Sequence, residues 1–291
     1  MIPVIEMMWM AEQLLCLRIR GVGFMDVIKR VKEENGNYFL GEEPILQNSS
    51  ISFKGKNNIL YCEKDVKLVD SKIVFNGNES VVFLGMNRNE YRINISVFNH
   101  QVCFWGRNNY INGVVNVVLS EQKHVFIGDD NLFSFGIWIR NADPHLIYDI
   151  NTKERTNFSK SIFIGDHVWL GQSSMILKGA QIGSGSIVSA MSVVPDVRIP
   201  SNECWGGVSA KPLKTGIFWE GSCVHRWTNK ETEQRMRYES DAYIFSKNQN
   251  NNTNYDVIDN RMSCAESANE KLNFLIQLRE IEEKNKFAIV P

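Results

Sequence analysis

Residues 164–199 read IGDHVW LGQSSM ILKGAQ IGSGSI VSAMSV VPDVRI, six consecutive hexads that each begin with an aliphatic residue. An α-helix cannot use this period, because apolar residues six apart fall on different helix faces. A chain that turns a corner every six residues can, since it stacks the six side chains in one interior column. We therefore predict a parallel β-helix, mainly β in class. The stacked residues are Ile164, Leu170, Ile176, Ile182, Val188 and Val194.

The six-residue register extends upstream, with one interruption. Two further hexads begin at Ile127 and Phe133, and Ile164 restores the register after a polar stretch at 140–160 without any repeat. An insertion that leaves the coils intact on both sides must loop outwards, and such loops are where sites tend to be built. Residues 45–138 contain short β-rich runs separated by Asn and Gly, which indicates less regular coils of the same solenoid. We assign the β-helix to residues 45–215.

The two ends of the chain lack the six-residue repeat and have other sequence patterns. Residues 3–34 carry helical apolar periodicity, broken at 21–23, so we predict an N-terminal helical segment over 1–40. Glu6 and Glu12 interrupt its apolar run, which is too short to span a bilayer. The segment either packs on the domain or a partner subunit, or contacts a membrane peripherally.

Residues 216–291 form the predicted C-terminal extension. It contains an aromatic segment at 216–246, an Asn-rich linker at 248–254 and a charged amphipathic helix at 263–286. We expect this helix to cap the end of the solenoid or to pair with another chain.

The composition and the net charge give no support for binding to nucleic acid. The 291 residues include 22% charged and 43% hydrophobic residues, as in a globular protein, and the net charge is −1. Bulk electrostatics therefore gives no attraction to nucleic acid. The six cysteines are scattered without a CxxC pair, which predicts reduced thiols and a cytoplasmic location.

At this level of detail the sequence resembles a known family. The hexads at 164–199, the loop motif DPHLIYD at 143–149 and the exit segment Ser209-Ala210-Lys211 are similar to left-handed β-helix acyltransferases. The likeness covers about residues 60–228. It is strongest to bacterial O-acetyltransferases that modify capsular polysaccharide or lipopolysaccharide, including the sialic-acid capsule enzymes. The resemblance implies left-handed coils, a homotrimer and acetyl-CoA bound in grooves between neighbouring subunits.

His145 is the first candidate catalytic residue. Acetyl transfer to an alcohol needs a base that removes the hydroxyl proton, and imidazole is the usual side chain because it exchanges a proton near neutral pH. The resemblance gives this role to the histidine of the projecting loop. Asp143, Asn141 or a backbone carbonyl would hold the imidazole tautomer. The alternative is a surface histidine without a role.

Trp169 is the second candidate catalytic residue. It ends the hexad IGDHVW, where the chain turns a corner, so its side chain is predicted on the outer surface. It matches an active-site tryptophan of the sialic-acid capsule enzymes, which implies that its indole N–H donates to the thioester or to the acceptor. Otherwise it packs under the loop. His145 and His167 have no third histidine at a useful spacing, so no metal is expected.

The acetyl-CoA site is predicted on the later coils. Small residues let a pantetheine arm pass, and lysines after the last coil pair with CoA phosphates. The exit segment lacks the Asn and Pro of its relatives but retains its lysine. The predicted residues are Gly171, Lys178, Gly183, Ser189, Ala190, Lys211 and Lys214.

Aromatic and polar residues near the loop predict the acceptor site, because sugars bind aromatic faces and hydrogen-bonding side chains. These residues are Trp138, Arg140, Tyr148, Arg155, His225 and Trp227. The sequence thus predicts an acetyl-CoA-dependent O-acetyltransferase acting on a saccharide of a bacterial surface polysaccharide. Two alternatives stay open: an N-acetyltransferase on a nucleotide-linked amino sugar, and a non-catalytic scaffold of a polysaccharide-assembly complex.

Overall fold

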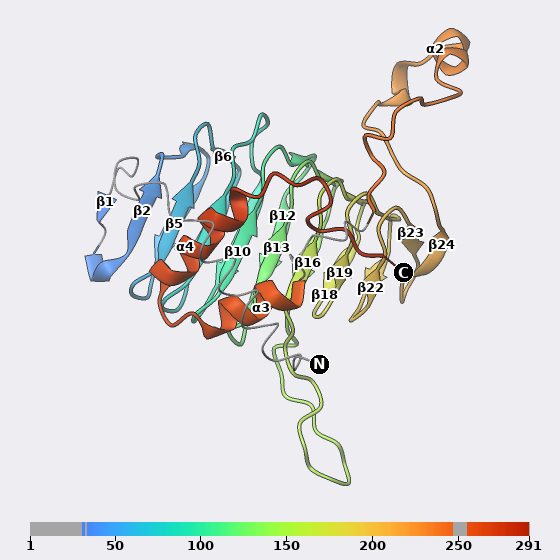
Figure 1. Ribbon diagram of the computed structural model, residues 1–291. Helices are drawn as coiled ribbons and strands as arrows, with labels where there is room; N and C mark the ends of the chain where they lie inside the picture. The colour runs from blue at the N-terminus through green and yellow to red at the C-terminus, as the bar shows by residue number, and fades with distance from the viewer. Residues whose placement is uncertain (1–30, 33, 247–254, 291) are drawn as a thin grey trace, which may run out of the picture.

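The computed structural model describes residues 31–32, 34–246 and 255–290, and it confirms the parallel β-helix (Figure 1). Successive coils contribute strands to three long sheets. The first sheet contains β1 (Val31–Lys32), β2 (Tyr38–Gly41), β5 (Ile59–Cys62), β8 (Val81–Leu84), β10 (Val102–Trp105), β13 (Val125–Ile127), β16 (Ile162–Ile164), β19 (Gln181–Ile182) and β22 (Arg198–Ile199).

The other two sheets close the solenoid. The second contains β4 (Ser50–Phe53), β7 (Lys72–Phe75), β9 (Ile93–Val97), β12 (Val115–Val118), β15 (Trp138–Arg140), β18 (Met175–Leu177) and β21 (Val193–Val194). The third contains β11 (Tyr110–Ile111), β14 (Leu132–Phe133), β17 (Trp169–Leu170), β20 (Ile187–Val188), β23 (Cys204–Gly206) and β24 (Lys211–Lys214). In the first coils, β3 (Ile45–Gln47) and β6 (Lys67–Val69) form a separate parallel pair.

The hexad aliphatics line the interior, as predicted, but in three columns rather than one. Ile164 pairs in register with Ile182 on the first sheet, Leu170 with Val188 on the third, and Ile176 with Val194 on the second. All six side chains are at most 1% exposed. Each hexad contributes to one of the three sheets, so a coil takes three hexads and equivalent side chains meet only after three hexads.

Coil length distinguishes the two halves of the solenoid. Hydrogen-bonded partners in the early coils are 22 residues apart, whereas in the hexad region they are 18 apart. The extra residues lie in longer corner turns, where positive-φ residues such as Asn57, Glu79 and Asn108 change the chain direction. Between β13 and β16 the spacing rises to 37, because the predicted insertion leaves the coil after β15. Figure 1 shows this loop projecting away from the solenoid.

The C-terminal extension covers the outer face of the first sheet. Outward aromatic rings of successive coils stack in a ladder that continues into the helices, with Phe126 and Phe163 at 5.2 Å between centroids and Phe163 and Tyr255 at 4.7 Å. The helices α3 (Tyr255–Cys264) and α4 (Ala268–Arg279) bury this ladder (Figure 1). The predicted single helix at 263–286 is therefore wrong in its bounds, and α4 lies along a sheet instead of capping the solenoid end.

The N-terminal boundary also differs from the prediction. Residues 31–32 and 38–41 form strands of the first sheet, and a 3-10 turn, η1 (Glu34–Gly36), separates them, so the end of the expected helical segment belongs to the solenoid. The rest of that segment, residues 1–30, and the Asn-rich linker lie outside the described residues. Within the described part, no helix is long and apolar enough to cross a membrane.

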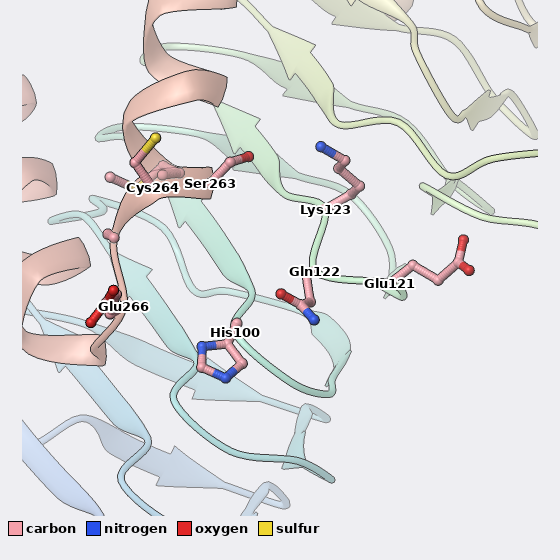
Figure 2. A pocket seen from close by; sticks show the side chains of 9 residues that line it. His100, Glu121, Gln122, Lys123, Ser263, Cys264 and Glu266 are labelled. Carbon is pink, nitrogen blue, oxygen red and sulfur yellow. The ribbon is translucent and has the colours of Figure 1, made fainter.

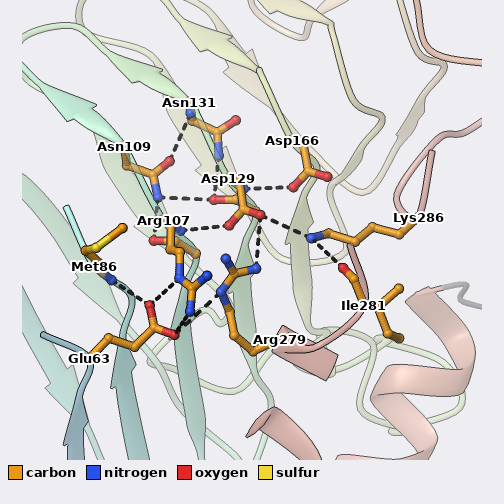
Figure 3. Close-up of polar contacts among 12 residues, drawn as sticks. Glu63, Met86, Arg107, Asn109, Asp129, Asn131, Asp166, Arg279, Ile281 and Lys286 are labelled. Carbon is orange, nitrogen blue, oxygen red and sulfur yellow. Dashed lines mark hydrogen bonds and ion pairs between the residues drawn. The ribbon is translucent and has the colours of Figure 1, made fainter. Parts of the chain in front are cut away.

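A charged network fixes the end of α4 and the following tail to the solenoid (Figure 3). Asp129 accepts from Arg279 at 3.3 Å and from Lys286 at 3.1 Å, while its own backbone N–H donates to the carboxylate of Asp166 at 2.7 Å. Glu63 pairs with Arg107 at 2.5 Å. Burial raises the pKa of Asp166 to about 7, and Lys286 opposes this shift. The network thus pairs Arg279 and Lys286 with a carboxylate of the solenoid.

Candidate active site

The inserted loop is a braced hairpin. Tyr148 and Arg155 pair as an antiparallel bridge, and the Arg155 guanidinium binds the Glu121 carboxylate at 2.6 and 2.8 Å. Asn157 accepts from the Ile147 N–H at 2.9 Å and donates to the His145 carbonyl at 2.7 Å. These bonds hold the loop backbone in one arrangement, so Arg155 anchors the loop base, whereas the sequence had predicted an acceptor contact for it.

His145 lies on this loop with an exposed side chain. No hydrogen bond to its imidazole occurs within the described residues, and neither predicted orienting residue contacts it. Asp143 instead pairs with Lys178 at 2.5 Å, and Asn141 accepts from the Ser120 N–H at 2.7 Å. Lys178, predicted at the CoA site, therefore joins the loop to the second sheet.

Trp169 lies on the third sheet, with its side chain on the outer surface as predicted. It is 38% exposed, and its indole N–H donates to the Ser134 hydroxyl at 3.3 Å. A groove of about 770 Å³ starts at Trp169 and runs towards the last coils; we call it the small groove. Four predicted CoA residues line it together: Gly171, Ser189, Ala190 and Lys214.

Glycine is required at 171 by the coils themselves. A Cβ there would come within 2.5 Å of the Ala190 nitrogen and 2.7 Å of the Val188 oxygen. Gly183 has a similar constraint but a different place, because a Cβ there would meet Ser201 and Ile289 under the C-terminal tail. Gly183 and Lys211 do not line the small groove. The close stacking of coils, rather than a ligand, accounts for both glycines.

His167 has a structural role that its sequence position did not reveal. Its ring stacks between Trp219 at 4.0 Å and Tyr243 at 4.2 Å, and Trp219 donates to the His167 carbonyl at 2.9 Å. Burial lowers the pKa of His167. The aromatic segment at 216–246 is therefore attached to the third sheet through this stack. Among the described residues, no three His, Cys, Asp or Glu side chains gather as metal ligands.

The other predicted acceptor residues are distributed over three places. Trp138 is 40% exposed on the second sheet, Arg140 follows it at the loop base, and Tyr148 is exposed on the loop. His225 lies in η2 (Val224–Arg226), just before α2 (Asn229–Gln234), and lines a second groove described below. Trp227 follows η2 and lines none of the grooves described. A single chain does not bring these residues together.

A separate cavity of about 420 Å³ lies at the corner where α3 meets the turns carrying His100 and Glu121 (Figure 2). None of the predicted site residues lines it. The candidate active site therefore consists of the small groove with Trp169 and the projecting loop with His145, and none of the three cavities described here is lined by both residues.

Known proteins share the sequence pattern and the fold of this chain. The model of the bacterial transferase hexapeptide family (six repeats) matches residues 161–196. A polysialic acid O-acetyltransferase of Neisseria meningitidis is 31% identical over 174 residues, which cover 59% of this chain and 79% of the relative.

Two solved structures superpose on most of the solenoid. The polySia specific acetyltransferase NeuO has a TM-score of 0.59 at 29% identity, covering 68% of this chain and 91% of NeuO. The polysialic acid O-acetyltransferase OatWY has a TM-score of 0.52 at 25% identity, covering 67% and 96%. Fold and site thus define a left-handed β-helix acyltransferase. Within that class, the chain belongs to the hexapeptide-repeat O-acetyltransferases and is an enzyme.

Proposed function

We propose that this enzyme transfers the acetyl group of acetyl-CoA to a sugar hydroxyl of a bacterial surface polysaccharide, with His145 as the general base. The observation that carries the proposal is the free imidazole of His145 on a loop braced by Arg155 and Asn157. A base must be positioned and yet unoccupied before it can accept a substrate proton. The named activities of the relatives support the reaction and the class of acceptor.

The small groove fits the acetyl donor. Gly171 and Ala190 present little side chain to it, so an extended pantetheine arm can lie against the coil backbone. Lys214 lies at its rim on β24, where an ammonium group pairs with CoA phosphates. Lys211 is exposed on the same strand, and we propose that it supplies a second ammonium group to these phosphates.

The chemistry follows from the groups present. The imidazole of His145 takes the hydroxyl proton while the sugar oxygen attacks the thioester carbonyl, and it then returns the proton to the leaving sulfur. The indole N–H of Trp169 is a donor for the reacting carbonyl oxygen. We propose direct transfer, because no serine or cysteine among the described residues is hydrogen-bonded to the His145 imidazole as a nucleophile would be.

The complete site requires a second copy of the chain, and we propose a homotrimer. His145 lines neither groove of its own chain, whereas the loop projects far enough from the solenoid to meet a neighbour (Figure 1). In a cyclic assembly, the loop of each subunit would cover the small groove of the next. We also place the enzyme in the cytoplasm, which agrees with the free thiols of the described cysteines.

Incubation with acetyl-CoA and a panel of bacterial polysaccharides tests the proposed function. We expect thiol release that depends on the acceptor, and a mass increase of the acceptor that mild base removes, because an O-acetyl ester is cleaved and an amide survives. A base-resistant product would establish the N-acetyltransferase instead. The absence of both thiol release and acetyl-CoA binding would contradict the enzyme assignment and would favour the scaffold.

A further inference from the structure

A second groove continues from the small one across Trp169. This large groove, of about 1,380 Å³, lies between the third sheet and the C-terminal tail. Ser134, Phe135 and Trp169 line both grooves. Since the donor thioester is proposed to reach Trp169 from the small groove, whatever lies in the large groove reaches the same tryptophan from the opposite side.

The wall of the large groove has the chemistry of a sugar-binding surface. Tyr110 and Leu132 are in register with Trp169 on neighbouring strands, so their side chains form one outward row. Tyr110 is 47% exposed, and Asn108 and Asn112 beside it offer amides. Aromatic rings flanked by neutral hydrogen-bonding groups suit the apolar faces and hydroxyls of a pyranose.

Two of the three basic side chains that line the large groove are paired with a carboxylate. Arg279 and Lys286 both bind Asp129, as Figure 3 shows. Lys284 donates to the Asp241 carbonyl at 2.7 Å. These three are the only Lys or Arg side chains among the described residues that line the groove.

Its negative charges are mostly unpaired. Asp130, Glu220, Glu282 and Glu283 line the groove, and none of them forms an ion pair within the described residues. Burial raises the pKa of Asp130, and the neighbouring Asp129 carboxylate acts in the same direction. Among the described residues that line the groove, these four carboxylates outnumber Lys284, the one Lys or Arg without an ion pair, so a polyanion would meet net negative charge. Like charges brought together in an interface disfavour binding.

We infer that the large groove binds the acceptor, and that this acceptor is an uncharged saccharide chain rather than a sialic-acid polymer. The inference rests on the proposed acetyl transfer at Trp169. The sugar that receives the acetyl group lies at Trp169, and the neighbouring sugars of the chain extend along Tyr110 towards the tail. The acceptor of this enzyme thus differs in charge from the polysialic acid named for two of the relatives.

Binding measurements separate the acceptor charge from turnover. We expect dextran, as an uncharged chain, to bind with at least about tenfold lower Kd than polysialic acid at low salt. The double variant Glu220→Gln/Glu282→Gln should lower the Kd of polysialic acid about tenfold, and 0.5 M NaCl should reduce this gain, because salt screens exposed charges. The matched control, Glu42→Gln/Glu43→Gln, changes the same charge at exposed positions of the first coils and should leave both affinities unchanged.

Two results would overturn the inference. One is tighter binding of polysialic acid than of dextran to the unaltered enzyme, and the other is equal behaviour of the groove variant and its control. Because binding needs no acetyl transfer, these results are independent of the thiol-release assay. Failure of the proposed function appears as absent transfer with every polysaccharide, whatever the affinities.

Discussion

Replacing His145 by alanine is expected to lower the turnover rate by about 10²–10⁴-fold. The variant loses the group that removes the hydroxyl proton during attack on the thioester. Acetyl-CoA affinity should stay unchanged, because the proposed role of His145 is to take the acceptor's hydroxyl proton and not to hold CoA. The fold should also persist, since the side chain is exposed and makes no hydrogen bond within the described residues. Steady-state thiol release and calorimetric titration with acetyl-CoA measure the two quantities separately.

His100→Ala is the matched control for this experiment. His100 lies in the turn beside the 420 Å³ cavity, away from both grooves, so its removal should leave turnover within about twofold, as expected for a residue without a catalytic role (Figure 2). Turnover of the His145→Ala variant near that of the unaltered enzyme would show that another group takes the proton. The His145 assignment would then be wrong even if acetyl transfer occurs.

Replacing Phe133 by alanine is expected to destabilise the folded chain by about 3–5 kcal/mol. Phe133 begins the hexad FSFGIW, is fully buried and packs on Trp105 at 5.2 Å between ring centroids. Its removal leaves a cavity inside the solenoid that neighbouring coils cannot fill without breaking their hydrogen-bond register. Urea unfolding followed by circular dichroism measures the change.

Phe135→Ala provides a control with the same side chain two residues away. Phe135 is 56% exposed at a corner of the coil, so the free energy of unfolding should change by no more than about 0.5 kcal/mol. Equal losses for the two variants would show that the interior register of the hexads is incorrect. The two phenylalanines thus test the assignment of interior and corner positions directly.

The regular part of the fold could be predicted because one period controls it. Six aliphatic residues at steps of six fix which side chains face inwards, and all six are buried. The same period cannot tell one interior column from three, because it gives the step along the chain but not the number of corners in a coil. Only the strand pairing shows that equivalent residues such as Ile164 and Ile182 meet after 18 residues.

The cover of the first sheet was missed, although its signal is present. Strands β8 (VVFL) and β10 (VCFW) are apolar at every position, whereas β9 (INISV) alternates. A strand without polar positions is buried on both faces. This pattern predicts that another element covers the first sheet. The helices α3 and α4 cover it with their apolar side chains.

The repeat fixes where the proposed donor residues lie, but it does not fix the path of the loop. Gly171, Ser189 and Ala190 belong to regular coils, so their shared groove follows from the repeat. The Asp143–Lys178 pair joins residues 35 apart, and the Glu121–Arg155 pair joins residues 34 apart. Both pairs depend on the path of an irregular loop, which no period describes. Because Asp143 and His145 are close in sequence, the motif predicted that they would pair. The structure instead pairs Asp143 with Lys178 on the next coil.

A mixed-trimer experiment tests most directly the central proposal, that His145 of one subunit acts on a thioester held at Trp169 of the next. Differently tagged His145→Ala and Trp169→Ala chains are produced together, and oligomers carrying both tags are purified. If the site is shared, about one third of the sites in the doubly tagged trimers are complete, since one neighbouring pair in each such ring supplies both an intact His145 and an intact Trp169 in the required order. We expect activity well above that of either parent variant. Mixed oligomers no more active than the parents would contradict a site built from two subunits.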